Sequence, residues 1–566
     1  MISVLILQRI LFAHAANPFL FFNFTTNFSD MKHLRFVFFF IIVSLCLFSG
    51  CAKRGYITGG PIDSLPPVVL KSNPENFSIH FDENEIEIQF DEYVKLENIN
   101  QNLIVSPPLN QMPEVLPMGF ASKKITVKIH DTLKPNTTYN FNFGQSIVDN
   151  NEGNPLGDFS YVFSTGDYID SLKISGSIQD AYSKNTDKNV KIMLYPAENF
   201  NDSTVYKEKP LYVGNTLEQT IFQLNNLKEG TYQIIALSDK NNNYLFDPKT
   251  DKIGFVEQTV ELPSEEELLY QLSLFKEEKS TNVARPTMVS QNKWLVPFEG
   301  KIKDVDWEIT ADGNRIDTYM QKVKNADSLY FFTPLTEYDS LQFSFTGKND
   351  YSKEFTVKPR KVNAIDSLIV KMTKTGTIGF RDSVQLTTTT PIIQIDSTKF
   401  TLIDKDSAAV PFTIQYDSLY FNLNIDFAKL ENENYQLDIF PGAIQDIYDK
   451  TNDTLSYKLK TTAHVDYGNL TFDIVNPNQK FPLIVQLLDD KENVLYENYL
   501  TEGNQTYFGL LPPKMYFVRT IIDENKNKKW DTGNYLLKKQ PEEVYYQTEP
   551  IDVRANWEMN ETITLE

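Results

Sequence analysis

The sequence predicts an all-β protein built from tandem sandwich modules, and three observations lead to that prediction. Apolar and polar residues alternate with a period of two in many short runs, as in half-buried strands. The 566 residues include 40 Phe and 29 Tyr, and aromatic residues favour strands. The chain also repeats itself at long range, and its length suggests three to five domains.

The first feature in chain order has the parts of a secretory signal. Lys32 and Arg35 precede an apolar run over 36–48, and two small residues then precede Cys51. A positive start, a short apolar stretch and small residues before the cut are typical of such signals. The run is too short to predict a membrane-spanning helix.

The segment Phe48–Cys51 resembles a lipobox, the processing site of bacterial lipoproteins, with Phe48 where Leu is usual. The resemblance implies that signal peptidase II cuts before Cys51 and that its thiol carries diacylglycerol, which anchors the chain to the lipid bilayer. The alternative is an ordinary signal with an incidental cysteine. We expect a signal peptide at 31–50, and residues 1–30 to be a mis-called extension ahead of a true start at Met31.

This resemblance predicts a lipid-anchored protein of the outer membrane. No acidic run follows Cys51, so the sequence leaves open whether the chain faces the periplasm or the cell surface. The only other cysteine, Cys46, lies in the predicted signal, and the body should therefore hold no disulfide. The net charge of −21 disfavours a nucleic-acid partner, because phosphate binding needs clustered Lys and Arg.

A Gly/Pro-rich stretch at 51–65 is expected to be a flexible tether. Short alternating runs follow it, and they predict an antiparallel sandwich over 66–168. These runs are Glu85–Phe90, Lys124–Ile129, Thr138–Phe143 and Phe159–Phe163. We expect Asp91 and Glu92 to form a turn after the first of them.

The same region resembles the bacterial Ig-like domain 5 family over about 100 residues. The resemblance is carried by Pro66–Val68, Ser72–Pro74, Ile88–Val94, Leu133–Tyr139, Ile147–Asp149 with Gly153-Asn154, and Phe163–Gly166. It implies an Ig-like β-sandwich of the kind found in envelope proteins, and it implies no catalysis.

Six residues recur 284 positions further along the chain without a gap. Leu227, Tyr232, Asp239, Asn241, Asn243 and Asp247 return as Leu511, Tyr516, Asp523, Asn525, Asn527 and Asp531. Residues 430–462 likewise parallel the end of the first domain. We therefore predict two copies of a pair, with β-modules at 169–277 and 464–566 and a second, divergent Ig-like domain at 361–463. A β-rich sandwich module at 283–360, with alternation at Trp307–Ile309 and Leu341–Phe345, lies between the pairs.

The two β-modules resemble prealbumin-like modules such as carboxypeptidase regulatory-like domains. The resemblance rests on Leu227, Gly230 and Tyr232, followed by a strand and an Asp/Asn loop. The second copy departs from it, because Lys514 stands in place of the glycine.

The two Asp/Asn loops are the sharpest candidate sites. In each loop, four side-chain oxygens at alternating or nearby positions could turn inward around calcium. They belong to Asp239, Asn241, Asn243 and Asp247 in the first loop, and to Asp523, Asn525, Asn527 and Asp531 in the second. An EF-hand-like loop needs Gly at its sixth place and Glu at its twelfth, whereas these loops have Tyr244 and Lys528, then Thr250 and Asn534. The alternative is an Asx-rich turn whose side chains bind the loop's own backbone. No other cofactor is expected.

Other candidate chemistry is sparse. His80, His130 and His464 lie in separate segments without a second metal ligand at a suitable spacing. No nucleophile elbow, phosphate loop or zinc-protease motif occurs. A recurring Asp-Ser/Thr-Leu pattern resembles an O-glycosylation sequon of some Gram-negative envelopes, although the same pair also suits a turn entering a strand. The candidate sites are Ser64, Ser171, Ser328, Ser340, Ser367, Ser418 and Thr454, and Thr132 has the same pattern.

The sequence thus predicts a non-catalytic scaffold that binds a protein partner of the envelope, for example as an accessory subunit of an outer-membrane assembly or transport complex. A surface adhesin or a glycan-binding protein is the alternative. A glycan-processing enzyme ranks below both, because no segment indicates a catalytic domain. No small-molecule substrate is indicated.

Overall fold

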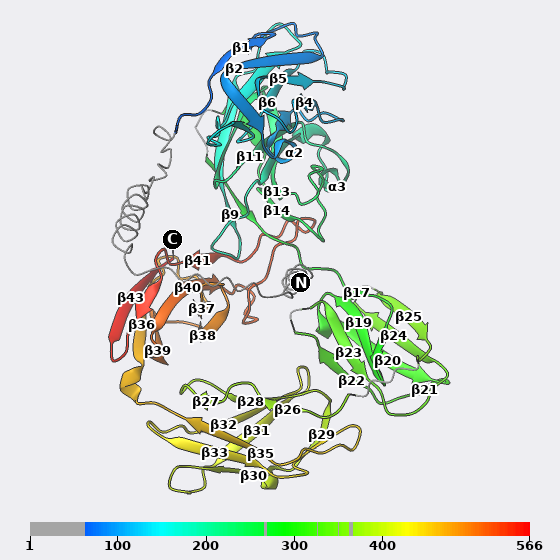
Figure 1. The fold of residues 1–566 in the computed structure, drawn as a ribbon, viewed down its shortest axis with the longest axis vertical. Coiled ribbons are helices and arrows are strands. Elements are labelled where there is room, and N and C mark those ends of the chain that lie inside the picture. Colours follow the sequence, from blue (N-terminus) through cyan, green and yellow to red (C-terminus); the bar gives the residue numbers. More distant parts are fainter. Residues whose placement is uncertain (1–62, 265–268, 325, 349, 361–365, 566) are drawn as a thin grey trace, which may run out of the picture. The chain divides into compact units, whose positions relative to one another are not determined.

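The computed structural model describes residues 63–566 except 265–268, 325, 349, 361–365 and 566 (Figure 1). The predicted extension, the signal peptide, Cys51 and most of the tether lie outside the described residues. Within them the chain is almost entirely β-structure, with short helices only, so the predicted all-β class of tandem sandwiches is confirmed. None of the helices described there is both long and apolar enough to cross a bilayer.

The first Ig-like module consists of two facing sheets with the strand orders β1-β2-β5-β4 and β3-β6-β8, and β7 pairs with β2. Its elements are β1 (Val69–Asn73), β2 (Glu85–Leu96), α2 (Ile99–Asn102), β3 (Ile104–Ser106), β4 (Glu114–Leu116), β5 (Ser122–Lys128), β6 (Thr138–Asn142), β7 (Ile147–Asp149) and β8 (Ser160–Ser164).

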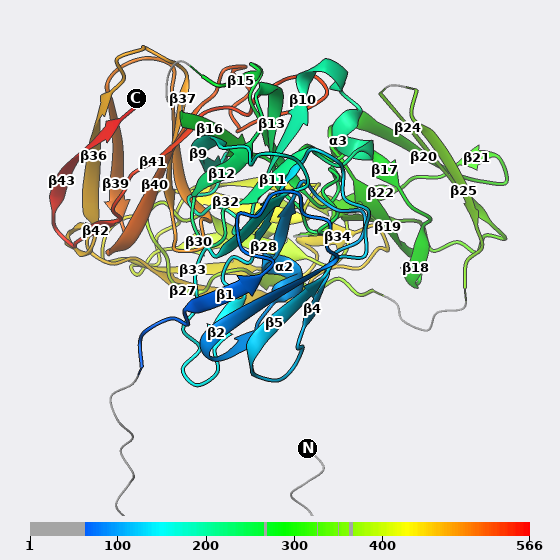
Figure 2. The same ribbon diagram turned by 90° about the horizontal axis from the view of Figure 1, so that it is seen from above.

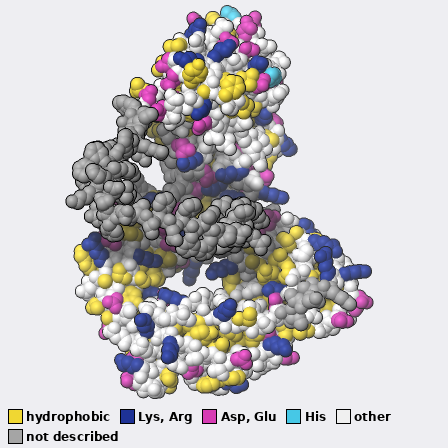
Figure 3. Space-filling model, in the orientation of Figure 1, with side chains coloured by type: hydrophobic (Ala, Val, Ile, Leu, Met, Phe, Trp, Pro, Cys, Tyr) yellow, Lys and Arg dark blue, Asp and Glu magenta, His cyan; other side chains and the backbone are white. Residues whose placement is uncertain are grey.

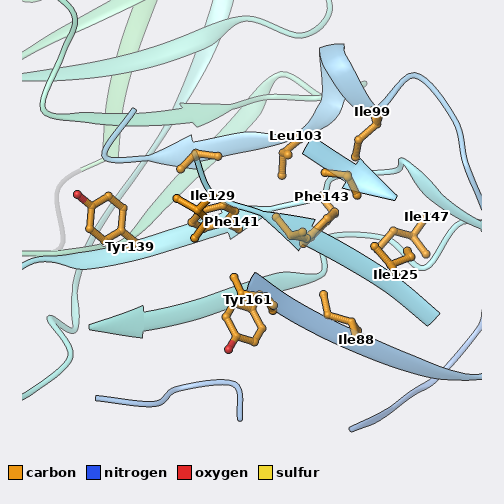
Figure 4. Packing of buried hydrophobic residues seen from close by; sticks show 14 of the residues in the cluster. Ile88, Ile99, Leu103, Ile125, Ile129, Tyr139, Phe141, Phe143, Ile147 and Tyr161 are labelled. Atoms are coloured by element: carbon orange, nitrogen blue, oxygen red, sulfur yellow. The ribbon is translucent and has the colours of Figure 1, made fainter. Parts of the chain in front are cut away.

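The alternating runs place their apolar residues between these sheets. Ile88 of β2, Ile125 of β5 and Phe141 of β6 are fully buried and point into one core (Figure 4). Full burial of such a side chain contributes about 1.5–3 kcal/mol. The period-two pattern therefore predicted both the strands and their inward faces correctly.

The predicted turn at Asp91 and Glu92 is wrong. Strand β2 continues to Leu96, with a register irregularity between Gln89 and Val94. The Asp91 carboxylate accepts the N–H of Val68 at 2.8 Å, and its own N–H donates to the Val68 carbonyl at 3.1 Å. These bonds hold the strand through the irregularity, and its far end pairs with β7.

The two predicted β-modules, here called the first copy (β9–β16) and the second copy (β36–β43), have the same topology. The sheet orders β12-β9-β16 and β11-β10-β13-β14 recur as β39-β36-β43 and β38-β37-β40-β41. In both, the last strand runs parallel to the first. The internal repeat is thus confirmed at the level of strand order.

The strands of the first copy are β9 (Leu172–Asp180), β10 (Lys191–Pro196), β11 (Tyr212–Asn215), β12 (Ile221–Leu227), β13 (Gly230–Ser238), β14 (Lys252–Phe255), β15 (Val260–Leu262) and β16 (Leu269–Leu274), with α3 (Thr204–Lys207) between β10 and β11. Those of the second copy are β36 (Gly468–Val475), β37 (Leu483–Leu488), β38 (Val494–Leu500), β39 (Gln505–Leu511), β40 (Lys514–Ile522), β41 (Val544–Tyr546), β42 (Ile551–Val553) and β43 (Glu558–Thr564).

The module that lies between the two predicted pairs in sequence consists of the sheet β17-β19-β23-β22, which β18 joins, and the sheet β21-β20-β24-β25 (Figure 2). As predicted, Leu341, Phe343 and Phe345 of β24 all point into its core. Its strands are β17 (Asn282–Val283), β18 (Thr287–Ser290), β19 (Lys293–Glu299), β20 (Val305–Ala311), β21 (Asn314–Arg315), β22 (Tyr319–Lys322), β23 (Ser328–Phe332), β24 (Leu341–Gly347) and β25 (Ser352–Val357).

The module predicted as a second, divergent Ig-like domain has the sheets β26-β28-β32-β31 and β27-β35-β33-β30, and β29 pairs with β34. The first sheet has the order of β1-β2-β5-β4, and the second has that of β8-β6-β3 with β27 as an additional edge strand. Each module has a tyrosine corner: Tyr139 accepts the N–H of Lys134 at 2.9 Å, and Tyr435 that of Leu430 at 2.7 Å. Its strands are β26 (Val370–Met372), β27 (Gly376–Thr377), β28 (Val384–Thr388), β29 (Ile392–Ile395), β30 (Phe400–Ile403), β31 (Phe412–Asp417), β32 (Asn422–Phe427), β33 (Asn434–Ile439), β34 (Ile444–Asp446) and β35 (Leu455–Lys460).

Candidate functional sites

The first Asp/Asn loop joins β13 to β14 and is held by its own side chains. The Asp239 carboxylate accepts the N–H groups of Asn241 at 3.1 Å and Tyr244 at 2.7 Å. Asn243 and Asp247 each accept the N–H of the residue two places further on, at 2.9 Å. These are the hydrogen bonds of Asx turns.

The second loop, after β40, is built the same way. Asp523 accepts the N–H groups of Asn527 at 3.0 Å and Lys528 at 2.8 Å. Asp531 accepts the Lys529 ammonium at 2.7 Å and the side-chain amides of Asn525 and Asn527. Burial tends to raise the pKa of Asp531, but these donors outweigh it and lower the pKa to about 2.

Backbone conformation is also shared by the loops. Tyr244 and Lys528, at the place where an EF-hand-like loop has glycine, have φ of 61° and 63°. Both loops therefore adopt the left-handed turn without glycine. Among the residues described, no group of three or more His, Cys, Asp or Glu side chains is arranged to hold a metal ion.

The structure adds one carboxylate to each loop that the repeat did not reveal. Asp251 accepts the N–H of Asp247 at 2.9 Å, and Glu542 accepts the N–H of Asp531, also at 2.9 Å. They serve equivalent loop positions but stand at different distances along the chain, because the second copy has extra residues before Glu542. The constant offset of 284 residues therefore does not relate Asp251 to Glu542.

Replacing Asp251 should test the Asx-turn role. Asp251 is fully buried and also accepts the N–H of Lys240 at 3.1 Å. We expect Asp251→Ala to lower the free energy of unfolding by about 2 kcal/mol, because the backbone N–H groups of Lys240 and Asp247 lose the buried carboxylate that accepts them. Asn243→Ala, which removes one exposed acceptor, should change it by less than about 1 kcal/mol. Urea denaturation of both variants measures this, and equal losses would contradict it.

Acid should loosen the second loop through Asp531. Its folded pKa of about 2 lies below the ordinary value of 3.8, so its ionised form stabilises the fold above about pH 4. That contribution should fade as the pH falls through 4 towards 2. The melting temperature of Asp531→Asn should therefore lie below that of the wild type at pH 6, and the gap should narrow at pH 2.5. If the difference in melting temperature were the same at pH 6 and pH 2.5, the charge of the Asp531 carboxylate would not contribute to stability.

The extra residues of the second loop reach the first copy. Tyr535 is only 1% exposed and lies in an apolar cluster with Phe246 and Phe255 of the first copy. Its ring centroid is 5.4 Å from that of Phe255, edge to face. Its N–H donates to the Glu277 carboxylate at 2.6 Å, and burial raises the pKa of its hydroxyl.

A second contact between the copies is centred on Arg519 of β40, which is 1% exposed. Its guanidinium donates to the Tyr182 hydroxyl at 2.7 Å, to the Gln486 side chain at 2.8 Å and to the Tyr546 hydroxyl at 3.1 Å. It also lies 3.9 Å from the centroid of the Tyr182 ring. Tyr546 in turn donates to the Tyr182 carbonyl at 2.8 Å.

The repeat itself carried a signal for this contact. At the offset of 284, Arg519 corresponds to Ile235, which belongs to the apolar cluster on the outer face of the first copy. An arginine at a position that is apolar in the other copy marks a buried polar contact. Tyr535 had no such signal, since it lies in the extra residues of the second copy.

The remaining candidate residues are dispersed. Ser64, Ser171, Ser367, Ser418 and Thr454 are exposed, whereas Ser328 and Ser340 are half-buried. At one of them the turn interpretation fits, because Asp417 accepts the N–H of Leu419 across Ser418. His80, His130 and His464 each lie 3.6–3.9 Å from a single carboxylate, those of Asp167, Glu114 and Glu431.

Comparison with known proteins identifies one module. Residues 63–165 match the family model of the bacterial Ig-like domain. No curated protein matches the chain. The solved structures that align with it do so at TM-scores too low to support an argument about arrangement or function.

Three of these structures are representative. Domains 1–6 of the surface layer protein SbsC share 10% identity over 86% of this chain and 67% of that one, with a TM-score of 0.15. The Bacillus anthracis TIE protein shares 10% over 89% and 76%, with a TM-score of 0.13. The Bacteroides ovatus mixed-linkage glucan utilization protein SGBP-B shares 12% over 79% and 99%, with a TM-score of 0.16. The first module of this chain, residues 63–165, is therefore a bacterial Ig-like domain, and it is followed by further tandem β-sandwiches.

Proposed function

We propose that this chain is a non-catalytic lipoprotein of the outer membrane that acts as a scaffold for a protein partner of the envelope. Cys51 is its lipid anchor, and the modules carry the binding surfaces. The observation that supports a scaffold best is the double contact between the copies, through Arg519 and Tyr535. It joins segments some 340 residues apart in sequence, as the Tyr182–Arg519 bond shows. A frame that is tied at two points holds its surfaces in fixed relative positions.

The exposed surface suits such a role. Acidic, basic and apolar side chains are interspersed on the face shown in Figure 3. Several large apolar side chains of the first Ig-like module are exposed, among them Leu65, Phe77 and Phe120 at 61–70%. Loops and sheet edges on Ig-like frames commonly bind partners.

The anchor is tested by metabolic labelling with an alkyne-bearing fatty acid. The wild-type chain should take up the label and remain with membranes. The Cys51→Ala variant should be unlabelled and should not remain with membranes. Cys46→Ala is the matched control and should be labelled normally. Label on Cys51→Ala, or none on the wild type, would refute the anchor.

The scaffold is tested by quantitative co-purification from solubilised envelopes. A protein partner should be recovered in a constant ratio with the wild type, and the ratio should fall when Arg519→Ile separates the copies. Recovery of a polysaccharide with no protein in constant ratio would favour the glycan-binding alternative instead.

A further inference from the structure

Strand β12 of the first copy is an edge strand without the usual protection. It ends the sheet β12-β9-β16, and its residues, Ile221–Leu227, include no charged residue and no proline. Edge strands are normally blunted by Lys, Pro or other charges, because their open backbone groups pair readily with another chain.

The pairing with β9 shows which backbone groups are open. The Thr220 carbonyl accepts the N–H of Ile178 at 2.7 Å. Hydrogen-bonded pairs alternate along an antiparallel ladder, so Phe222 and Leu224 bond to β9. Ile221 and Gln223 then direct their N–H and C=O groups to the open edge, about 6.6 Å apart along the strand.

The second copy has the same edge, but there it is capped. The carbonyl of Tyr507 accepts the Asn498 side-chain amide at 2.9 Å, and that of Gly509 accepts the Arg381 guanidinium at 3.2 Å. At the offset of 284 these residues correspond to Gln223 and Asn225. Within the described residues no hydrogen bond caps the edge-side carbonyls of Gln223 and Asn225.

One residue difference between the copies explains why the first copy lacks the hydrogen bond that the Asn498 side chain makes in the second. Gly214 pairs with Ile192 of β10 as Asn498 pairs with Val485 of β37, so the two residues are structurally equivalent. A Cβ at Gly214 would lie 2.6 Å from Leu224, which leaves no room for a side chain there. The position that supplies the capping amide in the second copy is therefore glycine in the first.

The open edge borders a groove of about 580 Å³ between the first Ig-like module and the first copy. Amide side chains line both walls of the groove. One wall carries Asn140, Asn142 and Gln145, and the other carries Asn215, Gln219 and Gln223. The only charged residues of the lining are Asp158 and Glu218. The side-chain oxygen of Asn140 is buried without a hydrogen-bond partner. Ile221 and Leu269, 62% and 76% exposed, add apolar surface.

We infer that this groove binds an extended, uncharged peptide segment of a partner protein, which adds a strand to the edge of β12. Backbone pairing with β12 supplies the affinity, and the amide side chains of the facing wall, on the first Ig-like module, satisfy backbone groups on the peptide's other edge. An extended peptide fits better than a sugar chain, because the one aromatic residue of the lining, Phe222, is only 4% exposed. The inference rests on the proposed scaffold function, since it names the chemistry of the partner.

The test begins by selecting peptides from a phage-displayed random heptapeptide library on the purified full chain. Selected peptides should be uncharged, and Gln223→Pro should weaken their binding about tenfold or more, because proline removes an edge-side N–H. Gln223→Ala keeps the backbone and should bind within about twofold of the wild type. Tyr507→Pro, at the matched position of the capped edge, should leave binding unchanged.

Amide exchange of the unaltered chain gives a second readout, which holds even if Gln223→Pro does not fold. Peptide should protect the N–H of Gln223, while the N–H groups of Phe222 and Leu224 are protected already. Failure to select any peptide, or equal binding to Gln223→Pro, would overturn the inference. An equal loss in Gln223→Ala would indicate side-chain recognition, as for carbohydrate hydroxyls, and would also overturn it. None of these binding experiments depends on Cys51 or on a membrane. A wrong assignment of the lipid anchor would therefore be detected by the labelling experiment and not by these experiments.

Discussion

Arg519→Ile should separate the two copies and lower the free energy of unfolding by about 3 kcal/mol. The guanidinium is the donor for Tyr182, Gln486 and Tyr546, and its removal takes a hydrogen bond from the buried Gln486 side chain and from the two half-buried tyrosine hydroxyls. The cation–π contact with Tyr182 is lost as well. Isoleucine is chosen because Ile235 occupies the equivalent position of the first copy and suits a strand.

Urea denaturation measures the loss, and amide exchange around Tyr182 reports the opening of the contact. Arg519→Lys should retain little of the stability, because an ammonium cannot reproduce the planar set of donors. Arg554→Ile is the control: Arg554 is exposed and contacts the Asp552 carboxylate and the exposed ring of Trp557, so the change should be below about 1 kcal/mol. If Arg519→Ile loses no more than Arg554→Ile, the contact does not hold the copies together.

Tyr535→Ala should lower the free energy of unfolding by about 3–4 kcal/mol and should destabilise the first copy, although Tyr535 belongs to the second copy. Removing a buried aromatic ring loses its transfer free energy and leaves a cavity beside Phe246 and Phe255. Exchange protection should fall at β14 in the first copy and much less at β40.

The adjacent Leu536 and Leu537 provide matched controls for Tyr535. They are 54% and 77% exposed, so truncation to Ala should cost less than about 1 kcal/mol. Thermal melting of the three variants side by side measures the difference. A loss confined to the second copy, with β14 unaffected, would show that Tyr535 does not couple the copies.

The repeat is where prediction from sequence reached furthest. Asp239 and Asp523 follow corresponding strands, and both accept backbone N–H groups of their own loops. Local turn chemistry depends on residues close in sequence, so a pattern in the chain can reveal it. Whether the loops take up calcium stays a prediction that binding measurements must decide.

Prediction was weaker where a residue acts at long range. The expected turn at Asp91 failed because Val68, more than twenty residues away, pairs with it and extends the strand. Asp251 and Glu542 were missed because extra residues in the second copy change their spacing. Nothing in the sequence around Tyr535 indicates a partner in another module.

The sequence by itself determined the all-β class, the inward faces of strands such as β2 and β24, the Ig-like domain predicted at 66–168, which the family model matches at 63–165, and the repeated β-module. These follow from period-two burial and from matched patterns, which are properties of short segments. Only the tertiary structure decided that Arg519 and Tyr535 join the copies and that the edge of β12 is open where that of β39 is capped. Those features depend on which surfaces meet, and small differences between similar copies, such as Gly214 against Asn498, decide them through steric fit.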